Sequence, residues 1–154
     1  MYRSISEKLN QWNKAEGRKP LLLQGARQVG KTWALKEFGE TSFDALAYVN
    51  FMEDRTLGTV FEGDLNPERI LRAISLQTGI QVEDQSTLVV FDEVQECPQA
   101  LTSLKFFAEH RPDIPIIAAG SLLGVALHRG VSFPVGKVDH LTMYPLTFKE
   151  YLRN

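Results

Sequence analysis

The residues best suited to chemistry form a glycine-rich segment in the first quarter of the chain. It matches the phosphate-loop pattern G-x-x-x-x-G-K-[ST] at every fixed position: Gly25-Ala26-Arg27-Gln28-Val29-Gly30-Lys31-Thr32. Glycines at both ends of such a loop let backbone N–H groups turn inward around phosphate oxygens at a helix start. Lys31 then adds a positive charge at the β- and γ-phosphates, and the Thr32 hydroxyl suits Mg²⁺, which prefers oxygen ligands. The segment predicts a nucleotide-phosphate site formed by residues 25–32.

A second candidate group follows an apolar run later in the chain. Residues 88–91 lead directly into Asp92 and Glu93. The stretch between Lys31 and Asp92 has room for one strand and one helix, so Asp92 can return to the same edge of the sheet. Asp92 is then expected to hold Mg²⁺ through water, and Glu93 to polarise the attacking water for in-line displacement. An isolated Asp-Glu pair would otherwise indicate a solvated turn, which the phosphate loop upstream makes the weaker interpretation.

Alternating strand and helix patterns surround these two groups. Short apolar runs predict strands near residues 21–23, 45–51, 88–91, 114–120 and 138–143. Apolar residues at helical spacing lie between them, at 33–38, after Asn66-Pro67 and after Pro98. The apolar runs are nearly continuous, as in strands covered on both faces. We therefore expect an α/β fold on a mainly parallel sheet, with a strand before the phosphate loop and a helix after it.

Composition and charge set bounds on the function. The 154 residues suit one domain, and 44% hydrophobic with 23% charged residues is typical of a globular chain. A net charge of −2 does not favour binding of nucleic acid by bulk electrostatics. The single cysteine, Cys97, excludes an intrachain disulfide, and the three histidines lack metal-site spacing. Because no apolar run is long enough for a membrane span and no signal-peptide pattern is present, the expected location is cytoplasmic.

Several segments together resemble a known protein family. They are the phosphate loop and residues 92–98, 118–123, 133–138 and 144–151. In this order they resemble a group of prokaryotic AAA-superfamily ATPases whose full-length members carry a C-terminal restriction-endonuclease-like domain of unknown function. The resemblance implies an AAA-type P-loop NTPase, a three-layer sandwich with a five-stranded sheet. In that sheet the phosphate-loop strand would be central and Asp92 would lie on a neighbouring strand. The resemblance also implies ATP, rather than GTP, as the nucleotide.

The resemblance further implies roles for residues outside the phosphate loop. Ser121 would be the sensor that reads the γ-phosphate and orients the water; it could also cap a helix over residues 122–128, and both roles can hold at once. The family tail usually has a Gly-Arg pair where this chain has Gly136-Lys137, and lysine lacks the planar fork of arginine. Arg129, Lys137 and a residue of a neighbouring chain therefore stay open as arginine-finger candidates.

The last residues predict the start of a helix. Thr147-Phe148-Lys149-Glu150 fits the capping box, but the helix would reach only Asn154. We therefore expect residues 1–154 to be an ATPase core domain cut within a C-terminal helix of a longer protein. A short natural terminal helix is the alternative. The C-terminal domain of the full-length chain would then be a partner, and a homo-oligomer is a further candidate.

The expected function is Mg²⁺-dependent binding and hydrolysis of ATP, coupled to a partner domain or process that the sequence does not identify. Lys31, Glu93 and Ser121 would carry the reaction, residues 25–32 would bind the nucleotide, and Thr32 and Asp92 would hold the metal. Glu93 favours hydrolysis over a small-molecule kinase, because the acceptor of a kinase is itself the nucleophile. The alternative is a nucleotide-sensing switch with little turnover.

Overall fold

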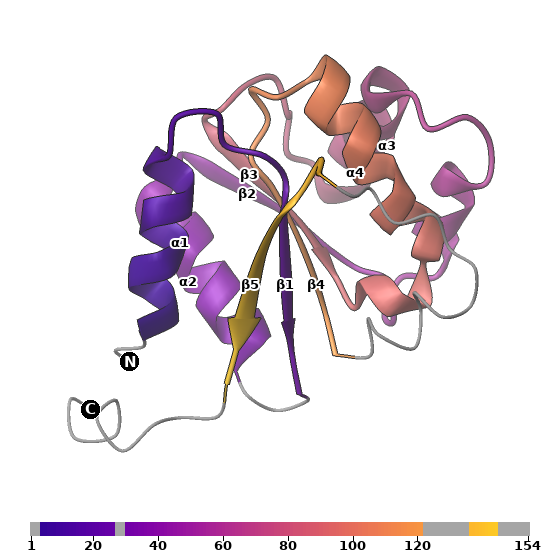
Figure 1. Ribbon diagram of the computed structural model, residues 1–154. Coiled ribbons are helices and arrows are strands. Elements are labelled where there is room, and N and C mark those ends of the chain that lie inside the picture. Colours follow the sequence, from indigo (N-terminus) through magenta and orange to yellow (C-terminus); the bar gives the residue numbers. More distant parts are fainter. Residues whose placement is uncertain (1–3, 27–29, 122–135, 145–154) are drawn as a thin grey trace.

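Five parallel strands form one sheet in the part of the chain that the computed structural model describes, residues 4–26, 30–121 and 136–144 (Figure 1). The strands are β1 (Leu21–Gly25), β2 (Ala45–Asn50), β3 (Thr87–Asp92), β4 (Ile116–Gly120) and β5 (Asp139–Met143). Their order in the sheet is β2-β3-β4-β1-β5, and each strand is parallel to its neighbours. All carboxyl ends therefore lie at one edge of the sheet. The predicted strands are confirmed to within two residues at each end.

Helices cover both faces of this sheet. One layer consists of α1 (Ser4–Lys14) and α2 (Lys31–Ser42). The other consists of α3 (Pro67–Thr78), α4 (Pro98–His110) and the short 3₁₀ helix η1 (Thr56–Phe61). A one-turn 3₁₀ helix, η2 (Val94–Glu96), connects β3 to α4. Figure 1 shows the two helical layers on either side of the strands, which confirms the expected three-layer α/β sandwich.

The strands bury both of their faces in separate hydrophobic clusters. Alternate residues of one strand belong to different clusters, because successive side chains of a strand point to opposite faces. In β3, Val89 and Phe91 pack beneath α3 and α4, whereas Leu88 and Val90 pack beneath α1 and α2. This burial on both faces explains why the inner strands β1, β3 and β4 contain nearly continuous apolar runs rather than alternating ones.

The strand order that the resemblance implied was wrong in two respects. The central strand is β4, and β1 lies between β4 and β5. Asp92 at the end of β3 is therefore separated from the phosphate-loop strand by β4, rather than lying on its neighbour. Apolar runs indicate where strands lie along the chain, but their order depends on where α4 returns the chain to the sheet. The order found here places the end of β4, and Ser121 after it, between the ends of β1 and β3.

Helix α3 begins where its sequence predicts, after Asn66. The Asn66 side chain accepts a hydrogen bond from the Glu68 N–H at 2.9 Å, and Pro67 occupies the first helical position. Gly79 closes the helix in the left-handed conformation, with φ of 74°. At the start of α4, Cys97 is buried, and burial raises the pKa of its thiol. This environment suits a small packed residue rather than a reactive thiol.

Helix α1 was not among the elements predicted from the sequence. Its buried residues, Ile5, Leu9 and Trp12, are spaced as on one face of a helix, and this spacing was the available signal. The helices expected over residues 122–128 and from Thr147 onward lie outside the described residues. None of the helices described is long and apolar enough to cross a membrane.

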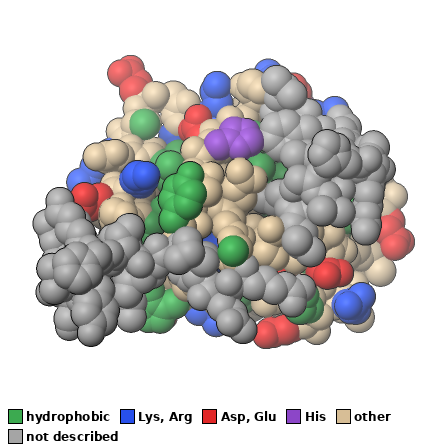
Figure 2. Space-filling model, turned by 60° about the horizontal axis from the view of Figure 1, so that its bottom comes forward, with side chains coloured by type: hydrophobic (Ala, Val, Ile, Leu, Met, Phe, Trp, Pro, Cys, Tyr) green, Lys and Arg blue, Asp and Glu red, His purple; other side chains and the backbone are tan. Residues whose placement is uncertain are grey.

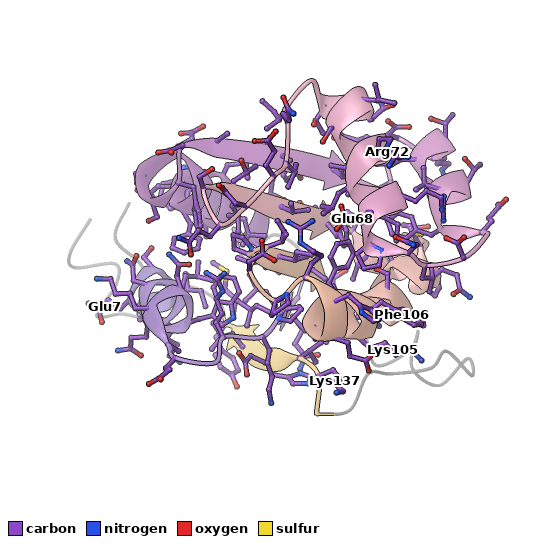
Figure 3. The ribbon with its side chains drawn as sticks, turned by 90° about the horizontal axis from the view of Figure 1, so that it is seen from above. Glu7, Glu68, Arg72, Lys105, Phe106 and Lys137 are labelled. Carbon is purple, nitrogen blue, oxygen red and sulfur yellow. The ribbon has the colours of Figure 1, made fainter. Side chains whose placement is uncertain are left out.

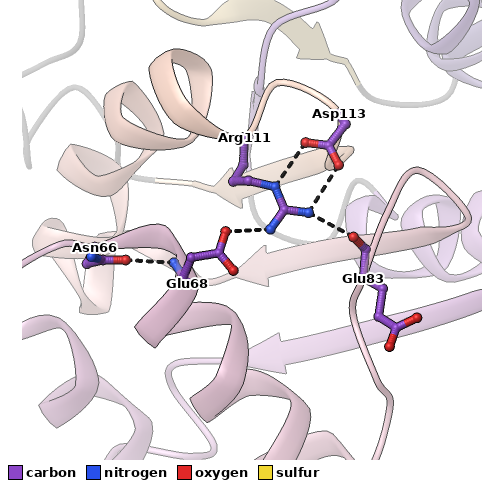
Figure 4. A network of polar contacts seen from close by, with 5 residues as sticks. All are labelled: Asn66, Glu68, Glu83, Arg111 and Asp113. Atoms are coloured by element: carbon purple, nitrogen blue, oxygen red, sulfur yellow. Dashed lines mark hydrogen bonds and ion pairs between the residues drawn. The ribbon is translucent and has the colours of Figure 1, made fainter.

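The amino edge of the sheet is held together by Arg111 (Figure 4). Its guanidinium, which follows α4, donates to Glu68 Oε1 at 2.6 Å, to the Glu83 carbonyl at 2.8 Å and to both Asp113 oxygens at 3.1 Å. These contacts raise the pKa of Arg111 and lower that of Asp113. One side chain thus connects the start of α3, the segment before β3 and the turn before β4.

Candidate functional site

The phosphate loop lies at the carboxyl edge of the sheet, between β1 and α2. Gly30 adopts the left-handed conformation, with φ of 90°, and Lys31 is the first residue of α2. A Cβ atom at Gly30 would lie 3.6 Å from Met143 Cε, which is an ordinary contact, so the backbone conformation rather than space favours glycine here. Arg27, Gln28 and Val29 lie outside the described residues. The predicted context of a strand before the loop and a helix after it is confirmed.

Lys31 folds back over the loop that precedes it. Its side chain is 8% exposed, and Nζ donates to the carbonyl oxygens of Gly25 at 2.9 Å and Ala26 at 2.8 Å. A buried ammonium needs such acceptors, because removing a charge from water is costly. Both acceptors are neutral carbonyls, so an anionic phosphate oxygen arriving at this place would be a stronger partner.

Thr32 and Asp92 meet although 60 residues separate them along the chain. Thr32 Oγ1 in the first turn of α2 donates to Asp92 Oδ2 at 2.7 Å. Asp92 is 1% exposed, and its other oxygen, Oδ1, accepts the Glu93 N–H at 2.9 Å. The pair predicted from the sequence to hold a metal is therefore brought into direct contact at the end of the sheet.

Tyr48 is a member of this cluster that the sequence analysis missed. Its hydroxyl donates to Asp92 Oδ2 and accepts from Asn50 Nδ2 at 3.4 Å. Lys36 Nζ of α2 lies 4.5 Å from the centre of its ring. Burial raises the pKa of Tyr48 well above its usual range, and the hydrogen bond to Asp92 and the charge of that carboxylate add to this effect. The available signal was the alternation of side chains between the two faces of a strand. Tyr48 pairs with Val90, which lies on the same face of β3 as Asp92.

Glu93 follows Asp92 in an unusual backbone conformation. Its φ of 55° makes it the one non-glycine residue with positive φ among those described. Its carboxylate oxygen Oε2 accepts a hydrogen bond from Gln95 Nε2 at 2.5 Å. A left-handed conformation at a residue with a long side chain costs of order 1–3 kcal/mol and is concentrated at functional sites. Gln95 was not singled out from the sequence, where only its spacing of two residues from Glu93 could have suggested it.

Two buried polar atoms at this edge have no hydrogen-bond partner in the described part of the chain. They are the hydroxyl oxygen of Ser121, directly after β4, and Oε1 of Gln95 in η2. Buried polar atoms are nearly always paired, so an unpaired one indicates a place where another group binds. Ser121 thus lies at the carboxyl edge of the sheet, where the family resemblance implies a residue that senses the γ-phosphate.

Comparison with known proteins decides the family. A family model described as "AAA domain" matches residues 17–152. The chain belongs to the AAA domain family. Membership of this family identifies the chain as an ATP-binding domain of the ATPase type. No match was found among curated proteins.

Among solved structures, this AAA domain is similar to the Orc1 protein of Aeropyrum pernix, whose structure was determined in complex with DNA. The TM-score is 0.55 at 17% sequence identity, and the match covers 98% of this chain. It covers 46% of the Orc1 chain, so the AAA domain described here spans less than half of that protein. At this identity the likeness concerns the fold.

The oxygen atoms of the AAA domain's site fit Mg²⁺. The Thr32 hydroxyl and the Asp92 carboxylate are hard oxygen ligands in contact with each other, next to the lysine of the phosphate loop. No cluster of three or more His, Cys, Asp or Glu residues in the described ranges could hold a metal by itself. This agrees with the usual state of Mg²⁺ at such sites, where substrate phosphates and water complete the coordination.

Lys137 of the AAA domain lies far from the site on its own chain. It precedes β5, whereas the site lies at the carboxyl ends of the strands, and its Nζ is 3.7 Å from Glu109 Oε1 of α4. Figure 3 shows Lys137 in the view onto the amino edge. Lys137 therefore cannot reach the phosphate loop of the same chain. Arg129 lies outside the described residues.

Figure 2 turns the carboxyl edge of the sheet toward the viewer, with both acidic and basic side chains visible among the described residues.

Proposed function

We propose that this AAA domain binds ATP with Mg²⁺ at residues 25–32 and hydrolyses it. The observation that supports this most directly is the hydrogen bond between Thr32 and Asp92. It connects the start of α2 to the end of β3 beside Lys31, which is the arrangement that a metal-bound triphosphate requires. Lys31, Thr32 and Asp92 could together bind a metal ion and the phosphate attached to it without a change of fold.

Each residue would have a distinct role in this reaction. Lys31 would exchange the carbonyls of Gly25 and Ala26 for the β- and γ-phosphate oxygens. Mg²⁺, held by Thr32 directly and by Asp92 through water, would neutralise charge on the phosphates. Glu93 would accept a hydrogen bond from the attacking water and take its proton. The Ser121 hydroxyl would donate to a γ-phosphate oxygen and so gain the partner it lacks within the described residues.

The test combines ATP affinity with phosphate release from Mg-ATP. Glu93→Gln keeps the size of the side chain but removes the base, so we expect unchanged ATP affinity and phosphate release at least about 100-fold slower. Lys31→Ala should weaken ATP binding by about 10- to 100-fold, since a hydrogen bond from a charged group is lost. Lys8→Ala is the matched control, because it removes an exposed lysine of α1 that has no part in the proposed site. Equal ATP affinity in Lys31→Ala and the wild type would overturn the site.

A nucleotide-sensing switch is the second candidate function. It is supported by the internal partners that Lys31, Asp92 and Glu93 already have, because nucleotide binding would exchange several hydrogen bonds and so change the segments after β1 and β3. ATP binding by wild type and Glu93→Gln, with no phosphate release by either, would favour the switch over hydrolysis.

We further propose that residues 1–154 act as one domain of a longer cytoplasmic protein, with a C-terminal domain as partner.

If a neighbouring copy of the domain completes the site, phosphate release per molecule should rise with protein concentration. An arginine supplied by a neighbour increases the rate by about 10³–10⁵ where it is known. A constant rate per molecule would argue against such help.

A further inference from the structure

We propose that Gln95 is a positioning residue that holds the Glu93 carboxylate in place for its reaction with water. This inference rests on the hydrolysis proposed above and adds a residue to its machinery. It comes from three observations at one turn of the chain: the Gln95–Glu93 hydrogen bond, the left-handed backbone of Glu93 and the unpaired oxygen of Gln95.

The contact itself fixes one oxygen of the carboxylate. Gln95 Nε2 donates to Glu93 Oε2 at 2.5 Å, so the Glu93 carboxylate is restrained by a side chain two residues away. The assignment of the amide nitrogen follows from this partner, because the amide oxygen would repel a carboxylate. The hydrogen bond to Oε2 leaves both lone pairs of Glu93 Oε1 available to accept the proton of water.

The local backbone explains how Gln95 reaches Glu93. Glu93 leaves β3 with φ of 55° and ψ of 45°, and the chain then makes the single turn of η2. Val94, within this turn, is 1% exposed and anchors it in the core. The turn thus sets Gln95 against Glu93, next to a residue that is anchored in the core.

The unpaired oxygen distinguishes this role from a structural one. Gln95 Oε1 is buried and has no hydrogen-bond partner within the described residues. A side chain retained for stability would satisfy both ends of its amide, because an unpaired buried acceptor destabilises the fold. The donor end of Gln95 is therefore the part that acts, and its loss should destabilise the protein by no more than the loss of one hydrogen bond to a charged group does.

The experiment is a double-mutant cycle on the 154-residue chain. The variants are Gln95→Leu, Glu93→Gln and their combination, with Gln99→Leu as a matched control on the exposed surface of α4. For each variant we would measure ATP affinity, the rate and KM of phosphate release, and the midpoint of thermal unfolding. The cycle shows whether Gln95 acts through Glu93 or independently of it.

We expect Gln95→Leu to lower kcat by about 10- to 100-fold, in line with the cost of a misplaced catalytic group. KM and ATP affinity should stay within about twofold of the wild type, since the phosphate contacts are untouched. The unfolding midpoint should fall by no more than the loss of one hydrogen bond allows. In the Glu93→Gln background the same change should have no further effect on kcat. Gln99→Leu should match the wild type throughout.

Other outcomes overturn the inference in distinguishable ways. Full activity of Gln95→Leu, or an additive loss in the double variant, would show that Gln95 does not act through Glu93 while leaving the proposed hydrolysis intact. A lowered unfolding midpoint together with weaker ATP binding would assign Gln95 a structural role. Absence of turnover in the wild type would remove the proposed hydrolysis, and this inference with it.

Discussion

The Asp92 carboxylate collects hydrogen bonds from three separate parts of the chain. Thr32 approaches it from α2, Tyr48 from β2 and the Glu93 N–H from the next peptide. A carboxylate offers about four acceptor positions, so three of them are used by donors of the protein itself. Its orientation is therefore set in advance, which suits the proposed role of presenting oxygen to a metal-bound water.

Tyr48 gives this cluster a dependence on alkaline pH. Because the pKa of Tyr48 is raised in the folded protein, its protonated form is favoured by folding. The stabilisation is fully present below the ordinary tyrosine value of about 10 and is lost as the pH rises above it, toward the raised value. We expect Tyr48→Phe to be less stable at pH 7 by about 1–3 kcal/mol, through loss of a hydrogen bond to a charged group.

Urea unfolding at pH 7 and above pH 10 would check this expectation. The stability difference between the wild type and Tyr48→Phe should shrink at the higher pH. Tyr2, Tyr144 and Tyr151 are present in both proteins, so their titration cancels in the difference. A difference that stayed constant with pH would show that the Tyr48 hydroxyl has no folded-state pKa shift.

How far the sequence predicts the site depends on how far apart along the chain the interacting residues are. The segment from Gly25 to Thr32 is local, so its spacing alone was informative, and Asp92 and Glu93 stood out at the end of an apolar strand. Tyr48 could not be selected in the same way, because a tyrosine within a strand is ordinary and its contact with Asp92 depends on strand pairing. Gln95 was missed because its significance lies in hydrogen bonding, which residue types do not reveal.

At the scale of elements, helix α3 shows which local rules carry through to structure. Asn66, Pro67 and Gly79 lie at its ends as capping and terminating residues, and its buried residues include Ile70 and Ile74. These features depend only on neighbours in sequence. The position of β4 between β1 and β3 depends on pairing between distant segments, and this is why the expected strand order was wrong.

The cap of α3 offers a direct test at this scale. Asn66→Ala removes the acceptor of the Glu68 N–H, so we expect a loss of about 1 kcal/mol in the free energy of unfolding. Asn10→Ala is a suitable comparison, since its exposed side chain donates to Ser6 O within α1. That change should be nearly neutral. Equal stability of Asn66→Ala and the wild type in urea unfolding would contradict the role of Asn66.

At the scale of the molecule, the two edges of the sheet have different tasks. The amino edge is tied together by Arg111, whereas the carboxyl edge carries the candidate site. Arg111→Met keeps an unbranched apolar stem but removes the hydrogen-bond donors of the guanidinium. We expect it to lower the free energy of unfolding by about 1–2 kcal/mol, since its ion pairs are partly exposed. ATP affinity should not change.

The stabilisation that Arg111 provides should also depend on pH in the acidic range. The Arg111 guanidinium, mainly through its hydrogen bond, lowers the pKa of Asp113, so this carboxylate stabilises the fold above the ordinary aspartate value of about 4. The contribution is lost as the pH falls below that value. The stability difference between wild type and Arg111→Met should therefore be larger at pH 6 than at pH 3. A larger difference at pH 3 would reverse the assigned sign.

The strand order also bears on how the domain is made. Synthesis starts at the amino end, so β1 leaves the ribosome long before its two flanking strands, which begin at Ile116 and Asp139. By contrast, β2 and β3 are both complete by Asp92 and can pair with each other earlier. Pairing across a long loop costs more entropy than pairing across a short one. A nascent chain halted before β4 would thus display the whole phosphate-loop motif without the scaffold that makes it a binding site.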